Sequence, residues 1–149
     1  MELTYENMKQ LLVDYFDILP SIEGEQYKPR MREFLAPDYK MHRPNRIYAA
    51  LEPVAAVIEN REEWVSHLCG HADKYKAVVS YQPEPLGIMI DERKKMGVMK
   101  ILEEFRSTAP GKKVFPDKKY FFVFFEFCVH DDKVKIKNEL IISIPGYLE

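Results

Sequence analysis

Features that mark secreted, membrane or nucleic-acid-binding proteins are scarce in this sequence. Its 149 residues contain only two cysteines, Cys69 and Cys128, and the formal net charge is only −2 at pH 7. Lysine and arginine are scattered, so the charge pattern predicts no nucleic-acid partner. The longest apolar run, Phe121 to Phe125, is far too short to span a membrane, and the N-terminus has no basic-then-apolar leader. We therefore expect a cytoplasmic protein without a membrane partner.

The residues that are present are typical of one folded domain. Hydrophobic residues make up 46% of the chain and charged residues 31%, and a chain of this length buries one substantial core. We predict a single domain over residues 1–149. Both cysteines lie in apolar patterns, which favours reduced core thiols over a disulfide.

Three segments in the first half have the apolar period of an amphipathic helix. The first runs from about Thr4 to Leu19, and a short second one runs from Pro29 to Leu35. The third opens at Asn60 and runs to about Tyr75. Asn60 is followed three residues later by Glu63, which is the spacing of a capping box.

Alternating apolar and polar residues predict strands in the rest of the chain. A short strand is expected over Tyr39–His42, whereas Asn45–Asn60 has the least regular pattern and is interpreted as a short helix and a loop. Helices followed by long meandering strands predict an α+β domain with the helices on one face of the sheet. The later strands are expected near 76–82, 86–92, 96–107, 119–130 and 133–144.

Two short phrases carry a resemblance to a known superfamily. The first is Phe34-Leu35-Ala36-Pro37-Asp38-Tyr39-Lys40-Met41-His42-Arg43-Pro44. The second is Phe127-Cys128-Val129-His130-Asp131-Asp132-Lys133-Val134, with Asp132 where glycine is usual. With the order of elements, they resemble the NTF2-like superfamily, in particular its SnoaL-like polyketide cyclases and its ketosteroid isomerase and scytalone dehydratase relatives. The resemblance implies a cone of three N-terminal helices packed on a strongly curved, mostly antiparallel sheet, with an apolar pocket inside.

Tyr15 and His42 are the first candidate catalytic residues. In the similar isomerases a tyrosine of the first helix donates a hydrogen bond to a developing enolate oxygen, and Tyr15 lies on the apolar face of that helix. The alternative is a core tyrosine bonded to the backbone. His42 stands where similar dehydratases and cyclases place a histidine or carboxylate, but it also suits a surface position at a strand end. Arg43 replaces the aspartate that is the isomerases' general base.

His67 and His71 lie four residues apart on the third helix. His71 is on the flank of the apolar face and is a candidate catalytic residue, whereas His67 lies farther toward solvent. Two histidines do not make a metal site, and no His-Glu-x-x-His phrase is present. We therefore predict no metal and no cofactor. Trp64, on the buried side of the same helix, is a candidate substrate contact.

Strand parity separates the acidic residues of the long strands. Glu103 shares its face with Met99 and Ile101, so it is an isolated acid on an apolar face and a candidate catalytic residue. In the similar cyclases and isomerases the pocket acid aligns near Phe125, which is a candidate substrate contact here. Glu126 then falls on the convex face unless a bulge shifts the parity.

Parity of the last strand and of the aromatic strand gives two further predictions. Asn138 is expected inward with Val134, Ile136, Leu140 and Ile142, where its amide binds a substrate oxygen or a neighbouring histidine, and Glu139 is expected outward. The other strand carries an apolar convex face that monomers rarely leave exposed. We predict a homodimer through that face, formed by Tyr120, Phe122, Phe124 and Glu126.

These residues lead to one main hypothesis and two alternatives. The main one is a cofactor-independent isomerase, dehydratase or cyclase that transfers protons on a small apolar cyclic or aromatic substrate. The second is a non-catalytic module of the same fold that binds a small ligand or dimerises. The third is a metal-dependent lyase that uses His67 and His71.

Overall fold

The computed structural model describes residues 2–18, 25–44, 56–81, 87–107 and 118–144. Side chains are described over these ranges apart from 70–81, 102–107, 118–120 and a few positions at the ends of elements. Three α-helices and one short 3-10 helix are present in this part of the chain, and none of these helices is long and apolar enough to cross a membrane.

The three predicted helices are confirmed within one or two residues. They are α1 (Tyr5–Ile18), α2 (Lys28–Phe34) and α3 (Arg61–Lys74), and the 3-10 turn η2 (Glu25–Tyr27) precedes α2. The capping box forms as expected. The Glu63 amide donates to Oδ1 of Asn60 at 2.9 Å, and the Asn60 amide donates to Oε1 of Glu63 at 3.1 Å. These bonds satisfy amides that the first turn of α3 leaves without helical partners.

In the described part of the chain, the strands form one sheet of seven. Its order is β2-β1-β7-β6-β5-β3, and β4 also pairs with β5; every pairing is antiparallel except that of β1 with β7. The five later predicted strands are present, and β2 forms where no strand was expected. The bounds are β1 Leu35–Pro44, β2 Ala56–Asn60, β3 Tyr75–Tyr81, β4 Ile88–Asp91, β5 Met96–Ser107, β6 Lys118–His130 and β7 Lys133–Ile144.

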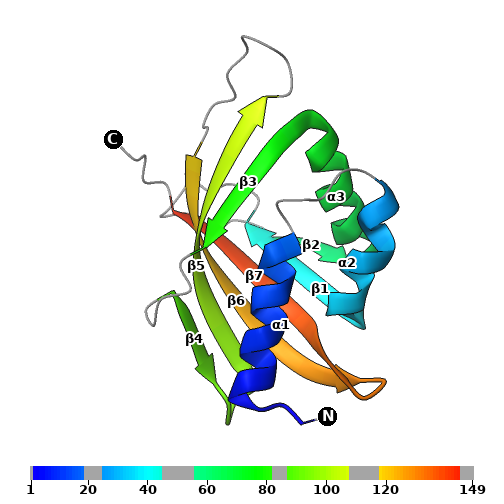
Figure 1. Cartoon of the computed structure of the whole chain (residues 1–149), viewed down its shortest axis with the longest axis vertical. Helices are drawn as coiled ribbons and strands as arrows, with labels where there is room; N and C mark the ends of the chain where they lie inside the picture. Colours follow the sequence, from blue (N-terminus) through cyan, green and yellow to red (C-terminus); the bar gives the residue numbers. More distant parts are fainter. Residues whose placement is uncertain (1, 19–24, 45–55, 82–86, 108–117, 145–149) are drawn as a thin grey trace.

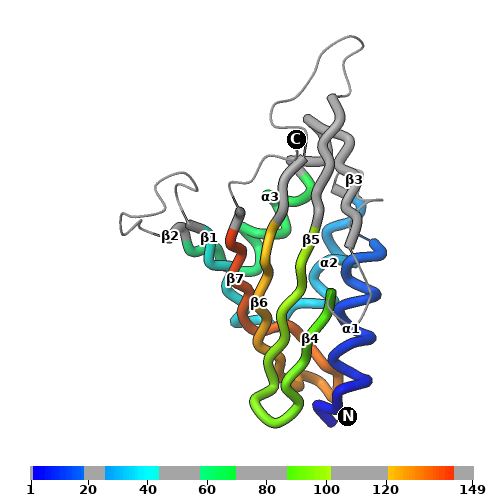
Figure 2. Tube along the Cα trace, turned by 90° about the vertical axis from the view of Figure 1, so that its left-hand side faces the viewer, coloured from blue at the N-terminus to red at the C-terminus, as the bar shows by residue number. Residues whose placement is uncertain are grey.

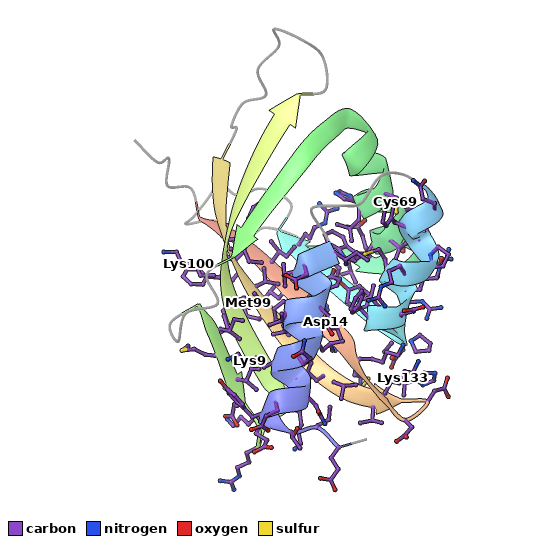
Figure 3. All side chains as sticks on the ribbon, in the orientation of Figure 1. Lys9, Asp14, Cys69, Met99, Lys100 and Lys133 are labelled. Atoms are coloured by element: carbon purple, nitrogen blue, oxygen red, sulfur yellow. The ribbon has the colours of Figure 1, made fainter. Side chains whose placement is uncertain are left out.

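The three helices cover one face of this curved sheet, as Figures 1 and 2 show from two directions. The predicted α+β architecture is therefore confirmed. Neighbouring positions of β5 illustrate the two faces: Met99 is fully buried and turns toward α1, whereas Lys100 is exposed and turns away (Figure 3). The largest fully buried side chains of the core are Tyr15, Tyr39, Phe125, Met8, Leu12, Met31, Leu35, Met41, Met99, Ile136, Val65 and Val123.

A bulge in β7 reverses the predicted alternation of that strand. Phe127 is opposite Ile136 but Glu126 is opposite Asn138, so Lys137 is an extra residue between the two pairs. Every side chain after a bulge moves to the other face. Glu139 is consequently only 2% exposed, whereas Leu140 is 36% exposed. The predicted inward set was therefore wrong beyond Ile136.

The hairpin that joins β6 to β7 uses two residues with left-handed backbone. His130 pairs with Lys133, and the two residues between them, Asp131 and Asp132, have φ of 50° and 59°. Such a two-residue turn requires positive φ at both positions, which aspartate tolerates better than most residues. Asp132 therefore takes a left-handed backbone conformation, which glycine adopts more readily than other residues.

Candidate active site

Glu139 is the centre of a polar cluster on the helix-covered face of the sheet. It lies on β7 with Met41 of β1 beside it on one side and Phe125 of β6 on the other. Both neighbours are buried, and Glu139 itself is 2% exposed. A carboxyl group in such surroundings is costly to ionise, because the charged form loses its hydration. Burial accordingly raises the pKa of Glu139 to about 8.

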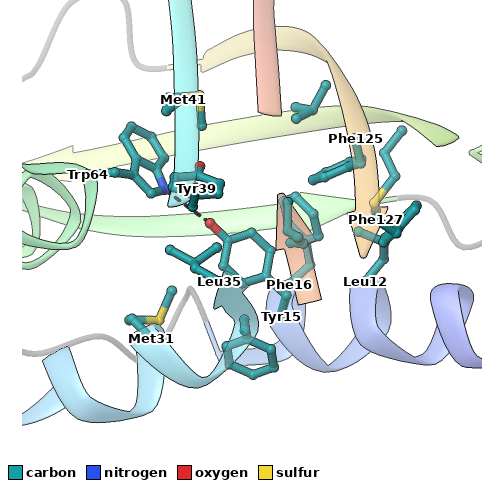
Figure 4. Close-up of a cluster of buried hydrophobic side chains, with 14 of the residues drawn as sticks. Leu12, Tyr15, Phe16, Met31, Leu35, Tyr39, Met41, Trp64, Phe125 and Phe127 are labelled. Atoms are coloured by element: carbon teal, nitrogen blue, oxygen red, sulfur yellow. Dashed lines mark hydrogen bonds between the residues drawn. The ribbon is translucent and has the colours of Figure 1, made fainter. Parts of the chain in front are cut away.

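Tyr15 brings a phenol from α1 to this carboxyl. The ring packs edge-on against Phe16 and Phe34, with centroids 5.2 and 5.4 Å away. Its hydroxyl accepts a hydrogen bond from Nε1 of Trp64 on α3 at 3.1 Å, which the dashed line in Figure 4 marks. Burial and then the negative charge of Glu139 raise the pKa of Tyr15 well above its ordinary value, against the effect of the Trp64 bond.

Tyr39 supplies a second phenol, from β1. Burial and the charge of Glu139 also raise the pKa of Tyr39 well above its ordinary value. The two phenols act in the opposite direction on the pKa of Glu139, but they only partly offset its burial. In the described part of the structure, Tyr39 makes no hydrogen bond to this carboxyl. Among the described residues, neither its hydroxyl nor Oε1 of Glu139 has a hydrogen-bond partner.

Two buried polar atoms without partners are unusual in a folded protein, because each loses its hydration without compensation. Both belong to one cluster, Tyr39 and Glu139. A ligand that both accepts and donates hydrogen bonds would satisfy the two atoms together.

A second polar group continues the same row of residues across the sheet. Met41 pairs with Glu59 on β2, so Glu59 follows Glu139 and Met41 on the helix-covered face. Oε1 of Glu59 accepts hydrogen bonds from Nε of Arg43 at 2.6 Å and pairs with its Nη2 at 2.5 Å. Oε2 of Glu59 lies 3.7 Å from Nδ1 of His67. Burial and the Arg43 charge lower the pKa of His67, although Glu59 opposes them.

The structure places His42 and Asn138 away from this cluster. His42 pairs with Ile58 on one side and Leu140 on the other, and both neighbours are exposed, so His42 belongs to the outer face. Nδ2 of Asn138 donates to Oε1 of Glu126 at 3.1 Å, on that same face. The predicted inward position of Asn138 was wrong, because the bulge at Lys137 turns it outward.

The remaining predicted site residues divide into two groups. Tyr15, Trp64 and Phe125 all lie in the buried cluster around Glu139, from α1, α3 and β6. Glu103 is in β5 and His71 is in α3, but their side chains lie outside the described part of the structure, as does that of Tyr120. Neither cysteine forms a disulfide; Cys69 is buried and Cys128 is half-buried.

Sequence reasoning missed Glu139, Tyr39, Glu59 and the inward side of Arg43. Glu139 was assigned to the outer face because simple alternation was extended through Lys137. Glu59 was missed because β2 was not predicted. The usable signal for Tyr39 was its two-residue spacing from Met41 within a strand, which puts the two side chains on one face.

Together these groups are suited to proton transfer. They comprise a buried acid with a raised pKa, two phenols and an indole N–H among apolar side chains, and a half-buried ion pair beside them. Among the described residues, no group of three or more histidine, cysteine, aspartate or glutamate side chains is arranged to hold a metal ion.

Comparison with known proteins bears on the fold. No protein-family model and no curated protein sequence matches the chain. A solved protein of unknown function with a cystatin-like fold, from Methylobium petroleophilum PM1, is similar with a TM-score of 0.70 and 11% identity, over 100% of this chain and 83% of that one. IdmH, a putative polyketide cyclase from Streptomyces antibioticus, is similar with a TM-score of 0.64 and 16% identity, over 91% of each chain.

A putative scytalone dehydratase from Novosphingobium aromaticivorans DSM 12444 gives a TM-score of 0.64 and 14% identity, over 97% of this chain and 88% of that one. This chain has an NTF2-like fold. The fold expected from the two sequence phrases is thereby confirmed. At such low identities the likeness extends to the fold, and activity has to be argued from the cluster that the NTF2-like fold encloses.

Proposed function

We propose that this protein is a cofactor-independent isomerase, dehydratase or cyclase that acts on a small, largely apolar cyclic or aromatic compound carrying an oxygen. The observation that carries the proposal is the Glu139 carboxyl, which is buried and has an unpaired Oε1 next to the unpaired hydroxyl of Tyr39. The surrounding side chains are apolar and aromatic, which suits a ring compound better than a charged substrate.

The pKa of about 8 makes Glu139 mainly a neutral acid at pH 7. In the proposed step its proton passes to a substrate carbonyl or hydroxyl oxygen, and the carboxylate that remains takes a proton from substrate carbon. The proton count balances: an enol rearranges to an isomer, or a protonated hydroxyl leaves as water. Tyr15 and Tyr39 donate hydrogen bonds to the substrate carbonyl oxygen and polarise the carbonyl group while the proton is transferred.

Two of the structural neighbours are named for the reaction classes that this chemistry serves. IdmH is named as a putative polyketide cyclase, and another neighbour is named as a putative scytalone dehydratase. These names support the proposed class. They leave the substrate open.

The test is solvent deuterium exchange into a panel of cyclic enones, aryl ketones and hydroxylated cyclic ketones, followed by mass spectrometry. Exchange at carbon next to the carbonyl reports proton transfer before the full reaction is known. We expect Glu139→Gln to lower the exchange rate by about 10²- to 10⁴-fold, the usual contribution of a general acid–base group. Glu126→Gln is the matched control and should leave the rate within about threefold, since Glu126 lies on the outer face and is bonded to Asn138.

A non-catalytic ligand-binding module of the same fold is the second candidate. The observation in its favour is that the Tyr15 hydroxyl already has a protein partner, because it accepts a hydrogen bond from Trp64. In that case the same compounds would shift the melting temperature of the protein, and Glu139→Gln would weaken that shift, but no compound would exchange deuterium.

A further inference from the structure

We propose that Arg43 and Glu59 form a positioning unit for Tyr15 that acts through Trp64. For its effect on catalysis the inference rests on the proposed function, but its structural part is testable without turnover.

Glu59 is a buried acid whose two carboxyl oxygens both have basic neighbours. It is 8% exposed, and it and Glu139 are the buried acids among the described side chains. Arg43 occupies Oε1 through two nitrogens, and His67 faces Oε2. A buried carboxylate is retained only where such partners satisfy it, and removing one partner leaves a charge that cannot be compensated. Glu59 therefore fixes the places of both Arg43 and His67.

The side chains of Arg43 and His67 both pack on the indole ring of Trp64. The guanidinium carbon of Arg43 lies 6.0 Å from the Trp64 ring centroid. The His67 ring stacks on Trp64, with centroids 5.3 Å apart and the planes 22° from parallel. A planar guanidinium over an indole face is an attractive arrangement. The Glu59 ion pair consequently constrains the orientation of Trp64.

The hydrogen bond from Trp64 sets the direction in which the Tyr15 hydroxyl proton points. An indole N–H can only donate, so the Tyr15 oxygen must be the acceptor in its bond to Trp64. The proton of the Tyr15 hydroxyl then points away from Trp64, and the Glu139 carboxyl is close enough to that hydroxyl to raise its pKa. Loss of the Trp64 bond would leave the hydroxyl free to rotate away from the acid and from a bound substrate oxygen.

A neighbouring ion pair provides the contrast. Arg32 of α2 binds Glu62 of α3 at 2.9 Å, with side chains 38% and 52% exposed. It links two helices at the surface, and exposed pairs of this kind contribute little to stability. Glu62→Gln is thus a control on the same helix that removes an arginine–glutamate pair and leaves the unit around Trp64 intact.

The experiment uses the fact that Trp64 is the only tryptophan in the chain. A ¹⁵N-labelled sample therefore gives one indole N–H signal, whose chemical shift and exchange with water report the bond to Tyr15. The Tyr15→Phe variant lacks the acceptor oxygen, so it gives the reference chemical shift of the indole N–H without this hydrogen bond. We expect Glu59→Gln and Arg43→Lys to move the signal toward that position and to speed its exchange at least about tenfold, and Glu62→Gln to leave it in place.

An indole signal that stays in place in both Glu59→Gln and Arg43→Lys would overturn the inference. If Glu59→Gln does not fold, Arg43→Lys decides alone, because lysine keeps the charge but loses the planar group over the indole. On a compound that exchanges deuterium, both variants should lower kcat by about tenfold or more while KM changes less. If the indole signal moves in both variants but no protein, native or variant, exchanges deuterium into any compound, the positioning unit stands and the proposed enzymatic function is rejected.

Discussion

Glu126 and Glu139 are acidic residues on neighbouring strands, β6 and β7, yet they face opposite sides of the sheet. Glu126 is half-buried on the outer face, and Oε1 accepts a hydrogen bond from the Asn138 amide. Glu139 is enclosed on the inner face, with one oxygen unpaired and a pKa raised to about 8 by burial. The side of the sheet to which each residue points thus distinguishes Glu126, which has a structural partner, from Glu139, which can exchange a proton near neutral pH.

The same contrast runs through the aromatic residues of β6. Phe125 is 1% exposed and stacks on Phe127, and it meets Phe16 of α1 edge-on at 6.0 Å. On the outer face, Phe122 pairs with Ile142 and Phe124 pairs with Leu140. Each of these outer residues is 36% to 40% exposed. On the inner face the aromatic side chains of β6 are packed in the core beside Glu139. On the outer face they form an apolar surface that is exposed on the single chain.

The largest expected effect comes from truncating an inner aromatic residue. Phe125→Ala should lower the free energy of unfolding by about 3 to 5 kcal/mol, because it leaves a cavity in a packed core. Phe122→Ala on the outer face should cost about 1 kcal/mol or less. Urea denaturation of dilute protein measures both, and equal costs would show that the two faces are not packed differently.

The second effect is the pH dependence that Glu139 gives to stability. Its pKa is raised from an ordinary 4.5 to about 8, so the folded state holds the proton more tightly than the unfolded state. That stabilisation is complete below about pH 4.5 and is lost as the pH rises through about 8. Compared with Glu139→Gln, the native protein should lose about 3 kcal/mol between pH 5 and pH 8. Glu126→Gln serves as the control and should track the native protein in urea denaturation at each pH.

A smaller effect is expected from the outer polar pair. Asn138→Ala removes the hydrogen-bond donor of Glu126 and should cost about 1 kcal/mol, since the pair is only partly buried. Activity on an exchanging compound should be unchanged. A loss of activity as large as that of Glu139→Gln would mean that the outer pair belongs to the site after all.

The smallest effect on a single chain is expected for Phe124→Asp, at about 0.5 kcal/mol or less. We nevertheless propose that this face joins two copies of the protein, since monomers rarely expose such a patch. Light scattering should then give the mass of a dimer for the native protein and that of a monomer for the variant. A monomeric native protein would remove the proposal and leave the outer face as ordinary surface.

Most of the fold could be predicted from the sequence, because helix period, strand alternation and turn residues agree locally. The third helix is an example: Asn60 and Glu63 specify its start without tertiary contacts. Strand β2 could not be predicted, since its five residues are held by pairing with β1 and have little pattern of their own.

The candidate site was predicted only in part for a similar reason. Tyr15 and Trp64 follow from helix faces, which local sequence sets. Glu139 depends on one extra residue, Lys137, in a strand whose alternation otherwise looks regular. A bulge is set by how the strand fits its neighbours, and it exchanges the faces of every residue beyond it. His42 was placed by resemblance, although Met41 rather than His42 points inward.

The most direct test of the central claim is a titration of the Glu139 carboxyl itself. Carbon-detected NMR of protein labelled with ¹³C at the glutamate side-chain carboxyl follows each acid with pH, and the resonance missing in Glu139→Gln assigns the signal. A midpoint near pH 8 is the result that a buried neutral acid predicts. A midpoint near the ordinary value of 4.5 would show an ionised carboxylate at neutral pH and would contradict the proposed acid chemistry.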